Sequence, residues 1–189
     1  VDSVSTFGGI PINMDESHID YLVTNPNKAL SSHMGIGLII ARHEKIKLLD
    51  PKKCGSYSLN LARHYKYSLN KEVCNSISIS SIIGLHTSLK STFISKEYII
   101  ETYNNYKKLF NLIYDNVKYN KLLDRNISSP CIITILCPKP GIIEYLKEHT
   151  FIVYECKGHL LDKGFQISFF GDDGTEENIR KLIQLINSY

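Results

Sequence analysis

The feature that most constrains the fold is a long stretch with the period of an α-helix in the middle of the chain. Ser95 suits the start of this helix because a serine hydroxyl accepts a backbone N–H of the first turn, where the acidic Glu97 also fits. Apolar and aromatic residues then recur every three or four positions: Ile99, Ile100, Tyr103, Tyr106, Leu109, Phe110, Ile113 and Val117. We predict one amphipathic helix whose aromatic side packs into a core. A surface that stacks nucleic-acid bases would be paired with a basic groove, which the sequence does not indicate.

Shorter elements precede and follow this helix. Before it, β-prone runs at residues 19–24 and 35–42 predict two buried neighbouring strands joined by a loop, and helices are expected at 59–67 and, mostly buried, at 80–90. After it, strands are expected at 131–137, 151–155 and 164–170, and helices at 142–149 and 176–187. The order of elements predicts an α/β chain that ends in a small two-layer α+β unit.

Composition excludes several classes of protein. The 22 basic and 19 acidic residues give a net charge of only +3 and form no long run of one sign, so neither a nucleic-acid nor a membrane partner is indicated. The longest apolar runs fall far short of the roughly 20 residues that a membrane span needs. The five cysteines form no C-x-x-C pair, which favours a reduced, cytoplasmic, soluble protein without a metal site. Because the chain opens at Val1 without an initiating Met or a leader, we expect it to be cut from something larger.

Two residues can carry chemistry at the ends of strands, where α/β sheets bind ligands. Asp2 lies in the opening run, and Lys28 directly follows a strand and the turn of residues 25–27. A lysine amine can form a Schiff base with a carbonyl cofactor, and a carboxylate can keep a pyridine nitrogen protonated. Spacing alone also leaves open that Lys28 is an ordinary solvated surface lysine.

Three runs in order carry a resemblance to a known family. They are VDSVSTFGGIPI at residues 1–12, IDYLVTNPNK at 19–28 and GIGLIIAR at 35–42. Together they resemble the cofactor region of class V pyridoxal-phosphate aminotransferases, and within that family most closely the 2-aminoethylphosphonate:pyruvate transaminases. A weaker similarity continues through residues 129–133 and 142–154 to the end of the chain.

The resemblance implies a fold and a division of the chain. It implies the C-terminal part of a fold type I pyridoxal-phosphate-dependent transferase. Residues 1–95 would be the end of the large cofactor-binding domain with its mixed sheet, 96–120 a long connecting helix, and 121–189 a small C-terminal α+β domain. The complete protein would act as a homodimer on a small-molecule amino donor and a 2-oxo acid.

The resemblance also implies roles for individual residues. Lys28 would be the Schiff-base lysine that later moves a proton, and Asp2 would pair with the ring nitrogen of the cofactor. Ser5 and Asn27 would also contact the cofactor. Gln166 stands where the family usually has an arginine that binds the substrate carboxylate. Residues 76–80, read as SISIS, replace a segment that in family dimers approaches the neighbouring subunit's cofactor phosphate and is usually rich in Thr, Pro and His.

Two other interpretations remain open at this point. The chain could be a non-catalytic remnant of an aminotransferase that keeps the packing without the reaction. It could also belong to a class V transaminase of the alanine:glyoxylate type or to a lyase, because an amide does not match a carboxylate as a guanidinium does.

Overall fold

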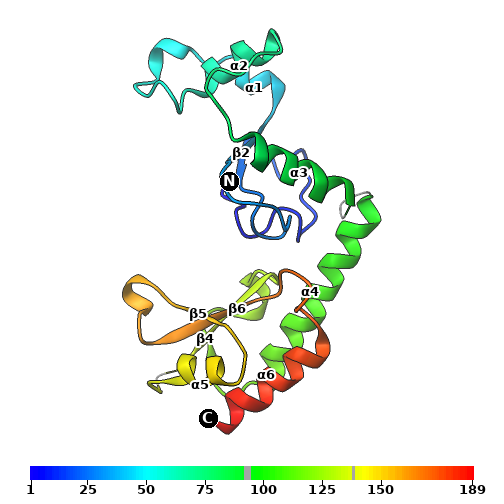
Figure 1. The fold of residues 1–189 in the computed structure, drawn as a ribbon, viewed down its shortest axis with the longest axis vertical. Helices are drawn as coiled ribbons and strands as arrows, with labels where there is room; N and C mark the ends of the chain where they lie inside the picture. The colour runs from blue at the N-terminus through cyan, green and yellow to red at the C-terminus, as the bar shows by residue number, and fades with distance from the viewer. Residues whose placement is uncertain (92–94, 138) are drawn as a thin grey trace. The chain divides into compact units, whose positions relative to one another are not determined.

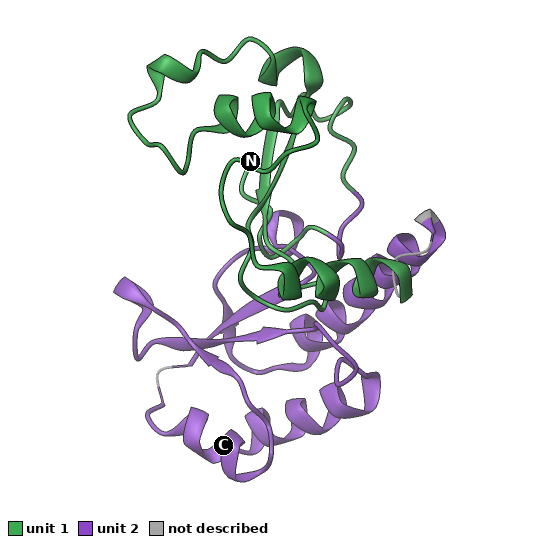
Figure 2. Ribbon diagram, turned by 45° about the horizontal axis from the view of Figure 1, so that its top comes forward, with its two compact units in different colours: residues 1–7, 12–92 green, residues 8–11, 93–189 purple. Residues whose placement is uncertain are grey.

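The computed structural model describes residues 1–91, 95–137 and 139–189, which form two compact units (Figure 2). Unit 1 comprises residues 1–7 and 12–92, and unit 2 comprises residues 8–11 and 93–189. The expected boundary between residues 95 and 96 comes directly after residues 92–94, which lie outside the described residues. Each unit is considered by itself below.

The sheet of unit 1 is built on two short antiparallel strands. β1 (Tyr21–Thr24) and β2 (Leu38–Ala41) pair with Val23 opposite Ile39, so the prediction of two neighbouring strands is confirmed. The prediction that both are buried is wrong, because Val23 is 44% exposed and Ile39 is 51% exposed. Successive side chains of a strand point to opposite faces, and in β1 the side chains of Leu22 and Thr24 face the buried side.

The helical elements of unit 1 are α1 (His43–Ile46), the 3₁₀ turn η1 (Pro51–Lys53), α2 (Leu61–Leu69) and α3 (Ile79–Ser91). Of these elements, α2 and α3 confirm the two helices expected before the long one. The expectation that the second of these, α3, is mostly buried is wrong. Its buried residues are Ser81 and Ser88, whereas Ile79 and Ile83 are 70% and 60% exposed. Hydroxyl side chains, rather than the apolar ones, face the rest of unit 1.

Unit 2 contains the long helix. Its elements are α4 (Lys96–Asn116), β3 (Asn120–Lys121), η2 (Arg125–Ile127), β4 (Ile132–Leu136), α5 (Ile142–Glu148), β5 (Tyr154–Glu155), η3 (Gly158–Leu160), β6 (Gly164–Ser168) and α6 (Glu176–Ser188). The four strands form an antiparallel sheet in the order β3-β4-β6-β5. The expected elements are present, although the strand predicted at 151–155 is reduced to the two residues of β5.

One face of this sheet packs on helices to form the core of unit 2. The helices α4 and α6 lie against each other, as Figure 1 shows in green and red. Ser95 caps α4 by accepting a hydrogen bond from Tyr98 N (3.3 Å), as predicted. The predicted apolar stripe is buried in the second half of α4 and just beyond its end, at Tyr106, Leu109, Phe110, Ile113 and Val117, whereas Ile100 in the first half is 41% exposed. In the parts of the chain that the structure describes, no helix has the length and apolar character needed to cross a bilayer.

Candidate functional site

The first three residues of the chain lie alongside β1 and run parallel to it. Ser3 N donates to Val23 O (2.8 Å), and Val23 N donates to Val1 O (2.9 Å), so Asp2 forms a parallel bridge with Val23. Parallel strands finish at the same edge of a sheet. The turn that follows Asp2 and the turn that follows β1 are therefore brought to one edge of the sheet in unit 1.

Hydrogen bonds fix the turn that carries Asp2. The exposed Asp2 carboxylate accepts a hydrogen bond from Val4 N through Oδ1 (2.9 Å). The Oγ of the buried Ser3 lies 2.6 Å from Thr6 Oγ1, and Thr24 on β1 donates through Oγ1 to Ser3 O (3.2 Å). A short aspartate side chain that accepts a backbone N–H two residues later is held in one orientation. The carboxylate is thus presented to solvent from a fixed turn.

Lys28 lies in a second fixed turn. Its carbonyl oxygen accepts a hydrogen bond from Ser31 N (2.8 Å), and Ser32 N donates to the buried Pro26 O (2.9 Å). The Lys28 side chain is half-buried, and within residues 1–91, 95–137 and 139–189 its Nζ forms no hydrogen bond or salt bridge. A primary amine that is partly shielded and not held by a carboxylate is available to react with a carbonyl group.

The other two residues expected around the cofactor lie in the same turns. Ser5 follows Asp2 and Asn27 precedes Lys28, and both are half-buried. The structure thus brings Asp2, Ser5, Asn27 and Lys28 to one edge of one sheet. Sequence reasoning missed Asn25, whose Oδ1 is buried and has no hydrogen-bond partner among the described residues. Its position directly after the end of β1 was the only available signal.

Gln166, the remaining predicted site residue, belongs to unit 2 and is described by itself. It lies on β6 between the buried Phe165 and Ile167, so its own side chain points to the exposed face of the sheet. Gln166 pairs with Thr134 on one side and Tyr154 on the other, and its Nε2 donates to Thr134 Oγ1 (3.4 Å). Gln166 and Thr134 thus present neutral hydrogen-bonding groups, an amide and a hydroxyl, on this face of the sheet.

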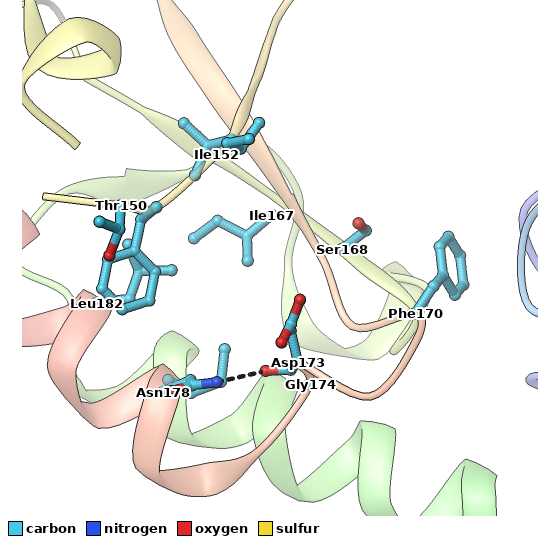
Figure 3. Close-up of a pocket in the computed structure, with 12 residues that line it drawn as sticks. Thr150, Ile152, Ile167, Ser168, Phe170, Asp173, Gly174, Asn178 and Leu182 are labelled. Carbon is cyan, nitrogen blue, oxygen red and sulfur yellow. Dashed lines mark hydrogen bonds between the residues drawn. The ribbon is translucent and has the colours of Figure 1, made fainter. Parts of the chain in front are cut away.

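Unit 2 contains a cavity of about 390 Å³ (Figure 3). Its wall includes the apolar side chains of Ile152, Ile167 and Leu182, and Asn178 Nδ2 donates to Asp173 O beside it (3.1 Å). None of the predicted site residues lines this cavity. Nor does any group of three or more His, Cys, Asp or Glu side chains suited to a metal ion occur among the described residues.

Comparison of the sequence with known proteins identifies relatives along nearly the whole chain. The family model described as aminotransferase class V matches residues 1–124. A 2-aminoethylphosphonate–pyruvate transaminase from Bacillus cereus is 30% identical over 98% of this chain and 53% of its own length. A bifunctional phosphonoacetaldehyde hydrolase/aminoethylphosphonate transaminase from Clostridioides difficile is 28% identical over 91% of this chain and 28% of its own length. The chain spans about half the length of the transaminase from Bacillus cereus.

Comparison of the fold identifies similar solved structures at lower sequence identity. Ureidoglycine–glyoxylate aminotransferase from Bacillus subtilis superposes with a TM-score of 0.83 at 16% identity, covering all of this chain and 51% of that one. Pyridoxamine–pyruvate aminotransferase from Mesorhizobium loti also gives 0.83, at 17% identity, over all of this chain and 50% of that one. The fold is therefore that of part of a fold type I pyridoxal-phosphate-dependent aminotransferase, as the resemblance implied. With its sequence matched over residues 1–124, this chain belongs to the class V aminotransferase family.

Proposed function

We propose that this chain forms part of a transaminase that exchanges an amino group between 2-aminoethylphosphonate and pyruvate and holds pyridoxal phosphate through Lys28. The observation that supports the proposal is the placement of the turns of Asp2 and Lys28 at one edge of the unit 1 sheet, which follows from the parallel bridge between Asp2 and Val23. The relatives named for this reaction are longer than this chain, so the activity is proposed for the complete protein.

The groups present at this edge fit such a cofactor. Two turns at this edge carry a carboxylate, a primary amine and a buried amide oxygen, the last two without a hydrogen-bond partner in the described part of the chain. Pyridoxal phosphate, when bound, supplies an electron-poor ring that withdraws charge from the substrate carbon. Asp2 would hold a protonated ring nitrogen by its negative charge, and Lys28 would anchor the group and then take and return a proton at Nζ. Ser5 and Asn27 would contact the group from the same turns.

A second substrate class is favoured by Gln166. A guanidinium binds a carboxylate through two parallel charged hydrogen bonds, whereas the Gln166 amide is neutral and already donates to Thr134 Oγ1. This observation supports a class V transaminase or lyase with a different acid, such as one of the alanine:glyoxylate type. A screen of amino donors and 2-oxo acids with the complete protein separates the two substrate classes.

The remaining expectations belong to the same proposal. Residues 1–95 would be the end of the cofactor domain, 96–120 the connecting helix and 121–189 the small domain. The complete protein would be a cytoplasmic homodimer that binds neither nucleic acid nor membranes.

The proposal is tested by trapping the cofactor on the chain. The 189-residue protein is mixed with pyridoxal phosphate, its absorbance spectrum is recorded, the adduct is reduced with borohydride, and the modified peptides are mapped. We expect the modification to concentrate on Lys28. The Lys28→Ala variant should lose the main adduct, whereas Lys66→Ala, which removes a lysine from α2, should keep it.

The possible outcomes separate the interpretations. Adducts spread evenly over surface lysines in the folded protein would overturn the proposed role of Lys28 and favour a non-catalytic remnant. If Lys28 is modified, Asp2→Asn in the complete protein should abolish transamination because the ring nitrogen loses its charged partner. An Asp2→Asn enzyme with full activity would contradict the role of Asp2.

A further inference from the structure

The turn that carries Lys28 continues into a segment that packs tightly within unit 1. Ala29 and Leu30, the two residues after Lys28, are only 5% and 2% exposed. The chain then passes through residues 31–34 before it enters β2 at Leu38. Because only one residue separates Lys28 from Leu30, any displacement of the Leu30 backbone moves the attachment point of the Lys28 side chain.

One side of α3 holds this segment by hydrogen bonds from side chain to backbone. Ser88 Oγ donates to Leu30 O, and Ser81 Oγ donates to Met34 O (2.9 Å). Both serines are buried, at 8% and 4% exposure. Buried carbonyl groups need a partner, and here the partner of Leu30 O is supplied by a helix more than fifty positions later in the sequence.

Gly84, which lies between these two serines, allows α3 to come close to the segment that follows Lys28. Gly84 lies three positions after Ser81 and four before Ser88, so all three residues share one side of α3. A Cβ at Gly84 would lie 2.8 Å from His33 Cδ2 and 3.4 Å from Ser32 Oγ. A side chain there would therefore push against the segment that follows Lys28.

We propose that Ser88, assisted by Ser81, is a positioning residue for Lys28. By fixing Leu30 O and Met34 O on α3, the two hydroxyls set the place and direction from which the Lys28 amine leaves the backbone. This inference rests on the proposed role of Lys28 as the residue that bonds the cofactor. It adds to that role a part of α3, residues 81–88, that sequence analysis did not connect with the cofactor.

The test compares Ser88→Ala and Ser81→Ala with Ser68→Ala in the 189-residue chain. Ser68 is the matched control because its hydroxyl donates to Tyr65 O within its own helix, α2, so its removal leaves the Lys28 segment unchanged. The first measurement is hydrogen exchange of the Ser31 and Ser32 amides, which close the turn. The second is the share of the borohydride-reduced pyridoxal-phosphate adduct that falls on Lys28 rather than on exposed lysines.

We expect Ser88→Ala to speed exchange of these amides about tenfold and to lower the Lys28 share several-fold, because the buried Leu30 carbonyl loses its partner. Ser81→Ala should have a smaller effect of the same kind, and Ser68→Ala none. A general loss of stability would lower the melting temperature without redistributing the adduct among lysines in protein that is still folded.

Two results distinguish this inference from the proposed function. Unchanged amide exchange and an unchanged adduct distribution in Ser88→Ala would overturn the positioning role while leaving Lys28 as the cofactor lysine. Absence of any preference for Lys28 in the unaltered chain would overturn the proposed function. In that case amide exchange alone would test whether α3 holds the turn. Equal exchange rates of the Ser31 and Ser32 amides in Ser88→Ala and Ser68→Ala would show that it does not.

Discussion

At the scale of single residues, Gly164 shows how a missing side chain can be required. It lies opposite Leu136 in the pairing of β6 with β4, and a Cβ there would lie far inside contact distance of the Ile135 carbonyl oxygen. We predict that Gly164→Ala lowers the free energy of unfolding by about 3 kcal/mol, because backbone in two paired strands must move apart. Urea unfolding measures the change.

Gly158→Ala separates this steric cost from the cost of backbone conformation. Gly158 has φ +62° and open space around the position of a Cβ. Its substitution should cost only about 1 kcal/mol, the penalty of the left-handed region for a residue with a Cβ. Equal losses in the two variants would refute the steric explanation for Gly164.

The candidate site residues that sequence analysis proposed are those with a local signal. Asp2 and Lys28 were recognisable because they lie near strand ends within runs that resemble a known family, and the structure places the turns that carry them at one sheet edge. Asn25 also follows a strand end but was not distinguished from the rest of its turn, and Ser88 has no such position. Their importance depends on burial and on contacts between distant segments, and serine in a helix has no periodic signal that distinguishes a buried hydroxyl from a solvated one.

At the scale of elements, α4 provides a pH-dependent test of its predicted burial. Desolvation by burial raises the pKa of the Tyr106 hydroxyl from 10 to about 12. An unfolded chain ionises this group near pH 10 while the folded chain keeps it neutral, so its contribution to stability is complete below pH 10 and is lost as the pH rises to 12. At pH 11 the loss is about 1.4 kcal/mol.

Tyr106→Phe should therefore be less sensitive to alkaline pH than the unaltered chain. The free energy of unfolding from urea titrations at pH 8 and pH 11 should fall less in the variant, by about 1.4 kcal/mol. Cys131, whose pKa burial raises to about 11, is present in both proteins, so its own burial affects both titrations. Tyr154→Phe is the control because Tyr154 is 61% exposed, and an equal effect in both variants would contradict the burial argument.

The elements also show where periodicity stops being informative. A stripe as strong as that of α4 predicts both the helix and the side that is buried, since the apolar residues have no other way to leave water. In α3 the helix was predicted correctly and its buried side was not. The contact with residues 30–34 requires small hydroxyl groups and Gly84, and a pattern of apolar residues carries no information about such a contact.

At the scale of the whole molecule, the two units differ in how much apolar surface they bury. Unit 2 has a continuous core that joins α4, α5, α6 and one face of the sheet. Among the described residues of unit 1, few apolar side chains are buried. They include Leu22, Ala29, Leu30 and Ala62. Since apolar burial is the main source of stability, unit 2 should be the more stable of the two.

This difference predicts that the chain loses its structure in two steps. In hydrogen exchange at increasing urea, amides of β1 and β2 should lose protection before those of β4 and β6, because each core consists of residues of one unit. Leu146→Ala, which empties a fully buried position of α5, should lower the stability of unit 2 by about 3 kcal/mol and leave the exchange of β1 and β2 unchanged. Leu22→Ala, at an equally buried position of β1, should have the reverse effect. If either substitution shifts both sets of amides together, the two cores unfold as one cooperative unit and the prediction is wrong.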